Sequence, residues 1–240
     1  MKSSVSDIES YKQICISDSI FDIFKSNADY QYVLEHLSKE IGQLYFDMIE
    51  DKNTILKSLF NDSIGSPSIF TYDNIKVSPT TLRYVKTAID IQKYFGCLLE
   101  KRVLEIGGGY GGQYCIFQKL FGCKHWDIVD LKEVCILIKK YASKLCFDNF
   151  TTIPFETLKQ NKYDVIISNY AFGECNKNIQ NEYLSKVISN SDSGYMTITF
   201  NDSSSLSLDE ILLSIPKAIV LPENPLTHHY NKLVVWGIKI

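Results

Sequence analysis

The chain has 240 residues, of which 45% are hydrophobic and 12% aromatic, enough for one full-sized domain with a sizeable core. Its formal net charge of −3 at pH 7 argues against a basic surface for nucleic acid or an anionic membrane. No apolar stretch is long enough to span a bilayer, and the opening MKSSVSDIESYKQ lacks the apolar centre of a secretory signal. The seven cysteines include no C-x-x-C pair, which favours reduced thiols over zinc or disulfides. We therefore expect a cytoplasmic protein.

The N-terminal part is predicted to be helical up to about residue 62. Residues 28–51 place apolar side chains three and four residues apart, on one helical face: Tyr32, Leu34, Leu37, Ile41, Leu44, Tyr45 and Met48. Residues 61–79 are rich in turn formers and read as a connector. We expect residues 1–77 to form a lid or dimerisation segment, and a homodimer is an assembly that such a segment would permit.

A further helix is predicted to follow the connector, within the sequence SPTTLRYVKTAIDIQKYFG. Ser78 is a suitable N-cap, Pro79 suits the first helical position, and Gly96 suits the C-terminal exit. The main domain is therefore expected to span residues 78–240.

Strand-like and helical stretches alternate after this helix. The expected strands are RVLEI, HWDIVD, FTTIP, YDVIISN and GYMTITF, and the expected helices lie in residues 111–122, 131–145, 155–160 and 175–190. Such alternation predicts a parallel sheet with helices on both faces. Residues 217–240 contain two further β-rich runs with no helix between them, which predicts an antiparallel C-terminal hairpin. The expected fold is α/β, with a seven-stranded, mostly parallel sheet.

A glycine-rich turn, GGGYGG, follows the first of these strands. Glycines permit positive φ and close approach of a ligand, and the helix N-terminus adds unpaired amides. Gly107, Gly109 and Gly112, with Gly111 beside them, satisfy the G-x-G-x-x-G dinucleotide pattern. Glu105, however, would oppose the pyrophosphate of NAD, whereas the ammonium and sulfonium groups of S-adenosylmethionine suit a carboxylate. The sequence therefore favours S-adenosylmethionine, and the alternative for Glu105 is a solvated carboxylate at the strand end.

Asp130 ends the second strand of the predicted sheet. A carboxylate there can accept hydrogen bonds from both ribose hydroxyls of the cofactor, with Leu131 next to it in the same site. Asp130 can also serve as a helix N-cap, and the two roles are compatible. Asp127, in the middle of the strand, is expected at the surface or at an edge.

These stretches, RVLEIGGGYGGQ, DIVDLKEV, YDVIISNYAFGE and GYMTITF, together with the upstream SPTTLRYVK, resemble the sugar O-methyltransferases of bacterial surface-polysaccharide clusters. The resemblance covers residues 78–240. It implies a Rossmann-like sheet, S-adenosylmethionine as methyl donor, and as acceptor a hydroxyl of a nucleotide-activated or glycan-linked sugar in capsule or lipopolysaccharide synthesis. In this family a serine commonly follows the phenylalanine of NYAF, whereas this chain has Gly173.

Further cofactor contacts are expected around the glycine turn and the upstream helix. Tyr110, inside the turn, is expected outside the core, beside the methionine part of the cofactor or the acceptor. Gln113 could bind the cofactor's carboxylate, and Asn169 could contact the cofactor through its amide. Arg83, next to Tyr84, could pair with the cofactor carboxylate or an acceptor phosphate, or form a surface ion pair.

A sugar hydroxyl is a poor nucleophile at neutral pH, so a positioned base should take its proton. Glu174 is a candidate for that base or for binding a second sugar hydroxyl, and it could instead begin the next helix. His228 and His229 have the right intrinsic pKa; at most one should point into the pocket, and the alternative is that both are exposed. Tyr170 and Phe172 are expected as pocket walls, and Tyr170 is also a catalytic candidate.

Several alternatives remain open at this point. Asn201 and Asp202 follow the fifth strand with the same geometry as Glu174, but NDSSS also fits an ordinary turn. No His/Asp/Glu cluster has metal-ligand spacing, so no metal is expected. Other candidate functions are methylation of a non-sugar capsule group such as a phosphoramidate, an NAD-dependent oxidoreductase, and a non-catalytic nucleotide-binding module.

Overall fold

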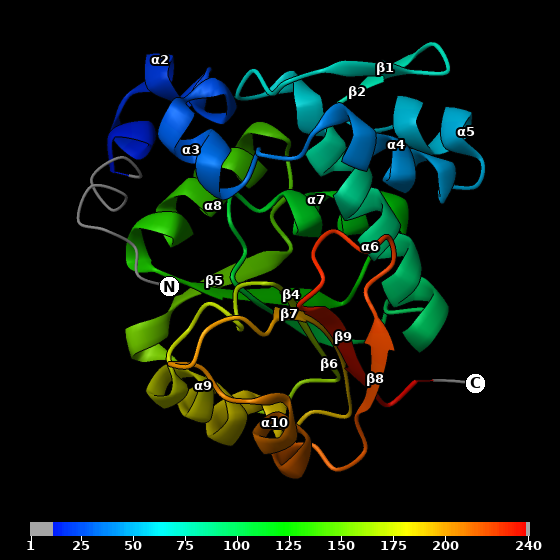
Figure 1. Ribbon diagram of the computed structural model, residues 1–240. Coiled ribbons are helices and arrows are strands. Elements are labelled where there is room, and N and C mark those ends of the chain that lie inside the picture. Colours follow the sequence, from blue (N-terminus) through cyan, green and yellow to red (C-terminus); the bar gives the residue numbers. More distant parts are fainter. Residues whose placement is uncertain (1–11, 239–240) are drawn as a thin grey trace.

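The computed structural model describes residues 12–238 and contains one large sheet with helices on both faces (Figure 1). The sheet has seven strands in the order β5-β4-β3-β6-β7-β9-β8. The strands are β3 (Arg102–Ile106), β4 (His125–Asp130), β5 (Phe150–Pro154), β6 (Val165–Asn169), β7 (Ser193–Thr199), β8 (Ile219–Pro222) and β9 (Asn231–Trp236). The first five are parallel, and β9 inserts antiparallel between β7 and β8. The predicted fold class is confirmed.

Both faces of the sheet are buried, which explains why its strands read as nearly continuous apolar runs. Alternate residues of β3 enter opposite cores: Val103 packs with the helices α6, α7 and α8, whereas Leu104 packs on the side of α9 and α10. These helices are α6 (Pro79–Phe95), α7 (Gly112–Leu120), α8 (Lys132–Lys144), α9 (Lys177–Tyr183), which a π-helical turn (Leu184–Ile188) continues, and α10 (Leu208–Ser214).

Helix α6 begins and ends as predicted. The Ser78 side chain accepts a hydrogen bond from the Thr81 amide, Pro79 occupies the first turn, and Gly96 leaves the helix with φ of 71°. The N-terminal segment forms a separate layer over α6, α7 and α8 (Figure 1). It contains α2 (Asp18–Phe21), α3 (Ala28–Val33), α4 (Lys39–Asp47), α5 (Lys52–Lys57), 3₁₀ turns (Phe24–Ser26 and Asn61–Ser63) and the hairpin β1 (Phe70–Tyr72) and β2 (Ile75–Val77).

The predicted continuous helix over residues 28–51 is wrong, because the chain breaks between α3 and α4. Ser38 caps α4 with its side chain, and Leu34 lies in the break. The predicted apolar face is correspondingly incomplete, since Leu44 and Met48 are exposed. The predicted helix over residues 155–160 is a single 3₁₀ turn (Phe155–Thr157).

Two further differences concern polar residues. Helix α10 was not predicted, although Ser207 and Glu210 form a reciprocal capping box at its start. Asp127 is not a surface residue: it is 5% exposed and binds Arg102, His125 and the Tyr163 hydroxyl. A buried carboxylate is stable in mid-strand only because these partners satisfy it.

Candidate active site

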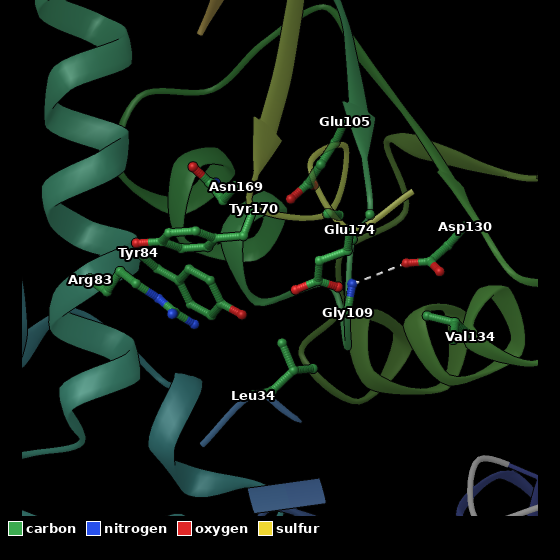
Figure 2. A pocket seen from close by; sticks show the side chains of 13 residues that line it. Leu34, Arg83, Tyr84, Glu105, Gly109, Asp130, Val134, Asn169, Tyr170 and Glu174 are labelled. Atoms are coloured by element: carbon green, nitrogen blue, oxygen red, sulfur yellow. Dashed lines mark hydrogen bonds between the residues drawn. The ribbon is translucent and has the colours of Figure 1, made fainter. Parts of the chain in front are cut away.

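A cavity opens at the carboxyl ends of β3, β4 and β6, beside α6 (Figure 2). Carboxyl ends of parallel strands are where ligands bind in open α/β sheets. The lining residues are Leu34, Arg83, Tyr84, Glu105, Gly107, Gly108, Gly109, Asp130, Val134, Asn169, Tyr170, Ala171 and Glu174. The structure therefore brings together most residues that the sequence nominated for the cofactor.

The glycine turn forms one wall of this cavity. Gly107, Gly109 and Gly111 have φ values of 78°, 57° and 90°, which side-chain-bearing residues rarely adopt. A Cβ atom on Gly107 would lie 2.0 Å from the Cβ of Ala171. The backbone of Gly107 and Gly109 therefore faces the cavity directly, because glycine has no side chain to cover it.

Glu105 lies at the inner end of the cavity and is 2% exposed. Its Oε2 accepts a 3.0 Å hydrogen bond from Trp126 Nε1 on β4. Burial raises the pKa of Glu105 to about 8, although the bond from Trp126 acts in the opposite direction. The alternative of a solvated strand-end carboxylate is therefore wrong.

Asp130 faces the opposite end of the glycine turn (Figure 2). Its oxygens accept hydrogen bonds from the amides of Gly109 at 3.2 Å and Leu131 at 2.7 Å. Burial raises the pKa of Asp130 to about 6, against the effect of these bonds. The residue at the N-cap of α8 is Leu131, which makes no side-chain cap, so the N-cap alternative for Asp130 does not hold.

Helix α6 supplies a buried cation to the cavity. Arg83 is 8% exposed. The alternative that it forms an ion pair at the surface is therefore wrong. Its guanidinium carbon lies 5.6 Å from the ring centres of both Tyr84 and Tyr170. Its Nε is buried and has no hydrogen-bond partner. An unpaired buried donor on a cation is suited to an anionic ligand group.

The segment after β6 supplies the remaining polar groups. Asn169 and Tyr170 line the cavity, as does Glu174. Glu174 lies two residues before Asn176, the N-cap of α9. The alternative that Glu174 begins this helix is therefore wrong. A serine, which the sugar O-methyltransferases commonly have at the position of Gly173, would not fit here unless neighbouring atoms moved. A Cβ at Gly173 would lie 2.9 Å from Ile198 Cγ2 and 3.2 Å from the Thr199 amide nitrogen.

Five of the residues nominated for the cofactor or the pocket wall do not line the cavity, and one of them is Gly111 of the glycine turn. Tyr110 is fully buried, 4.8 Å from the Tyr141 ring centre, so the expectation that it lies outside the core is wrong. Gln113 is also buried, and its amide donates to the Tyr84 carbonyl, which links α7 to α6. Phe172 is wholly within the core against α9, and Leu131 packs beside the other core cluster.

The two histidines do not reach the cavity. His228 and His229 are exposed and pack with Tyr230, with ring centres 4.5 Å apart from each other. His229, Asn201 and Asp202 line a different surface hollow near the start of α10. Asp202 also accepts a hydrogen bond from the Ser204 amide, as in an ordinary turn. The structure therefore agrees with the alternative that both histidines are exposed, and neither lies at the cavity as a candidate base.

Sequence reasoning missed some lining residues. Leu34, Val134 and Ala171 were not nominated, because they are ordinary apolar residues whose sequence context carries no signal of ligand contact.

Within residues 12–238, no group of three or more His, Cys, Asp or Glu side chains is placed to hold a metal ion. The helices in this part of the chain are all too short or too polar to cross a membrane.

No protein-family model matches the chain, and no curated protein matches it. Similar solved structures include magnesium protoporphyrin IX methyltransferase from Synechocystis PCC 6803 with bound S-adenosylmethionine, at 14% identity and TM-score 0.49, covering 67% of this chain and 78% of that one. An O-methyltransferase family protein from Burkholderia thailandensis is 9% identical, with TM-score 0.47 and coverages of 66% and 58%. TehB from Haemophilus influenzae is 13% identical, with TM-score 0.47 and coverages of 62% and 60%. This chain spans less than two thirds of the last two proteins, and likenesses this distant carry no conclusion about its reaction.

Proposed function

We propose that the protein is an S-adenosylmethionine-dependent O-methyltransferase that acts on a sugar hydroxyl in capsule or lipopolysaccharide synthesis. The observation that carries the proposal is Glu105, a buried carboxylate inside a cavity whose wall is a glycine turn. Burying a carboxylate without a cationic partner is unfavourable, and the ammonium group of the cofactor's methionine part supplies that partner.

The other lining residues fit the same cofactor. Asp130 would accept the ribose hydroxyls, the exposed main chain of Gly107 and Gly109 would face the nucleoside, and Val134 would pack against the adenine. At the other end, Arg83 and Asn169 would hold the methionine carboxylate. In this orientation the methionine carboxylate would accept a hydrogen bond from the Arg83 Nε, which has no partner in the protein.

Leu34 supports a lid role for the N-terminal segment. It lines the cavity, and its carbonyl accepts a hydrogen bond from Thr80 on α6. A Cβ atom on Gly109 would lie 3.0 Å from Leu34 Cδ1, so this side chain packs over the turn. We propose that residues 1–77 cover the bound cofactor and exclude water from it.

When bound, S-adenosylmethionine supplies an activated methyl electrophile, so the protein's main task is to hold an acceptor oxygen in line with it. The sugar acceptor rests on the motifs RVLEIGGGYGGQ and SNYAFGE. Glu174 and Tyr170 both line the cavity, and they remain as candidates for the group that accepts the hydroxyl proton.

An NAD-dependent oxidoreductase is the second candidate, favoured by the spacing of Gly107, Gly109 and Gly112. In that case Glu105 would face a pyrophosphate, and two negative groups would share a buried site. Isothermal titration calorimetry with S-adenosylhomocysteine, NAD and NADP separates the two candidates. We expect binding of S-adenosylhomocysteine alone; binding of a nicotinamide cofactor without S-adenosylhomocysteine would reject the proposal.

A further inference from the structure

The cavity at the glycine turn is too small, as it stands, for the cofactor that we assign to it. Its volume is about 70 Å³, whereas pockets for ligands of drug size measure about 300 Å³ or more. Most of its walls are the glycine turn, the strand ends and α6, which the packed cores on both faces of the sheet hold in place. Entry of S-adenosylmethionine therefore requires the remaining wall to move.

That remaining wall is Leu34, which faces the cavity from the N-terminal segment (Figure 2). Its Cδ1 atom lies 3.0 Å from the place that a Cβ atom on Gly109 would occupy, so it closes the cavity against the glycine turn. Leu34 belongs to the connection between α3 and α4, residues 34–38, which has neither helical nor strand structure. Such a connection can rearrange without breaking a helix or a strand.

The helices on both sides of this connection are anchored by buried aromatic residues. Tyr30 of α3 packs edge-to-face on Phe24, with ring centres 4.8 Å apart. Phe46 of α4 stacks on Tyr72, with ring centres 5.4 Å apart. Residues 34–38 therefore form a short strap between two fixed ends.

Polar contacts fix the rest of the N-terminal segment behind the glycine turn. The Asn61 side chain donates to the Tyr110 hydroxyl at 3.1 Å and accepts from the Tyr141 hydroxyl at 2.6 Å. Asp62 accepts hydrogen bonds from the amide and the hydroxyl of Ser78, both at 2.8 Å. Movement of the whole segment would break these bonds, whereas movement of residues 34–38 leaves them intact.

Glu35 makes the closed position of this strap unfavourable in the empty protein. It is 8% exposed, and its carboxyl group contacts Thr80 of α6. Within residues 12–238, however, its Oε1 atom has no hydrogen-bond partner, and neither has Nε of Arg83 on the same helix. Unsatisfied buried polar atoms cost free energy that is recovered when water reaches them. Opening would hydrate both atoms, and a bound cofactor carboxylate would satisfy Arg83 in the closed position.

We propose that residues 34–38 are a gate, which opens to admit the cofactor and closes over it while the rest of the N-terminal segment stays docked. This inference rests on the function proposed above and narrows the lid role to one connection. Leu34 packs against the cofactor when the gate is closed. Glu35 determines how readily the gate opens.

The gate is tested by the rate constants of S-adenosylhomocysteine binding to the immobilised full chain, measured by surface plasmon resonance. We expect Leu34→Ala to raise both the association and the dissociation rate constant by about 10-fold, because the closing contact is lost. Glu35→Leu should lower the association rate constant by about 10-fold, because its closed gate no longer buries an unsatisfied carboxyl group. Leu44→Ala, at an exposed position of α4, should match the wild type. Wild-type rate constants in Leu34→Ala would reject the gate, and in Glu35→Leu would reject the role of Glu35.

Hydrogen–deuterium exchange of the wild type, which needs no variant, tests which part of the segment moves. We expect S-adenosylhomocysteine to slow exchange of the amides of residues 34–38 by about 10-fold or more and to change that of residues 61–63 by less than about threefold. Unchanged exchange at residues 34–38 would overturn the gate. Equal protection of both stretches would also overturn it, because the whole segment would then move.

The two proposals fail in different ways. If the wild type binds neither S-adenosylhomocysteine nor S-adenosylmethionine, the proposed function fails and the gate fails with it. If S-adenosylhomocysteine binds but its rate constants and the exchange pattern do not respond as described, the gate alone is rejected.

Discussion

Trp126 Nε1 donates a hydrogen bond to Glu105 Oε2 across the pair of strands β3 and β4, and both side chains are buried. The bond fixes the direction of the carboxyl group at the inner end of the cavity. It does not compensate for burial, because the pKa of Glu105 is still raised to about 8. In the unliganded protein at pH 7, Glu105 is therefore mostly protonated, and a cationic ligand should drive off this proton.

We expect S-adenosylhomocysteine binding at pH 7 to release up to about one proton per chain, because its ammonium group favours ionised Glu105. Calorimetric titrations in phosphate and Tris buffers should give different apparent enthalpies, since the two buffers take up protons with different heats. In Glu105→Gln the buffer dependence should disappear and the affinity should fall. Equal enthalpies for the wild type in both buffers would contradict the proposed role of Glu105.

The same group predicts a pH dependence of stability. Between about pH 4.5 and 8 the folded protein holds a proton on Glu105 that the unfolded chain releases, so the free energy of unfolding falls as pH rises. With 1.36 kcal/mol per pKa unit, this loss is on the order of 4 kcal/mol. Glu105→Gln lacks this titrating group, so its free energy of unfolding should not show this fall. In urea unfolding, the stability of the variant relative to the wild type should therefore increase from pH 5 to pH 8. A constant difference across that range would be inconsistent with a raised pKa.

Asp130 and Asp127 provide a matched pair on one strand. We expect Asp130→Ala to weaken S-adenosylhomocysteine binding by about 10- to 100-fold, through loss of hydrogen bonds to the ribose. Asp127→Ala should do the reverse: it leaves the buried Tyr163 hydroxyl without its acceptor and removes the partner of Arg102, and it destabilises the fold by about 1–3 kcal/mol without changing the affinity. Calorimetry and urea unfolding of both variants check this, and equal effects on affinity would remove the ribose assignment.

The fold was predictable where local sequence signals and long-range packing agree. The caps of α6 at Ser78 and Gly96 depend on neighbouring residues only, and the alternation of strands with helices follows from the period of the apolar residues. Glu105 and Asp130 were found for the same reason, since position at the end of a parallel strand determines which edge of the sheet they reach.

Side-chain direction in loops was not predictable. Tyr110 lies between Gly109 and Gly111, whose positive φ values turn its ring into the aromatic core, and nothing local in the sequence specifies that turn. His228 and His229 share the β8–β9 loop with Glu223, yet only Glu223 is buried, where it accepts a hydrogen bond from the Tyr170 hydroxyl. Because Tyr170 is distant in the sequence, nothing local in the loop indicates that Glu223 would be buried.

Gly173 is expected to be intolerant of the serine that is common at this position in the sugar O-methyltransferases. The new side chain would press on Ile198 and on the Thr199 backbone, and overpacking of this kind costs about 1–3 kcal/mol. Gly173→Ser and Gly173→Ala should therefore both lower the midpoint of urea unfolding by similar amounts. If Gly173→Ser alone were as stable as the wild type, a hydrogen bond from its hydroxyl would have to offset the clash.

Lys25 joins the N-terminal segment to the core behind the glycine turn, and it should give stability a slope opposite to that of Glu105. Its ammonium is fully buried, donates to the Asn61 carbonyl at 2.7 Å and lies 4.2 Å from the Tyr110 ring centre. Burial lowers the pKa of Lys25 to about 8 from 10.5. Between these two values the unfolded chain keeps a proton that the folded protein has released, so the free energy of unfolding rises with pH.

The difference in stability between the wild type and Lys25→Met isolates this contribution from that of other titrating groups. We expect the wild type to gain on Lys25→Met from pH 7.5 to pH 9.5, by on the order of 2 kcal/mol, in urea unfolding followed by far-ultraviolet circular dichroism. Lys139→Met, at an exposed position of α8, should show no such gain. A difference between wild type and Lys25→Met that does not change with pH would mean that the buried ammonium keeps its proton throughout this range.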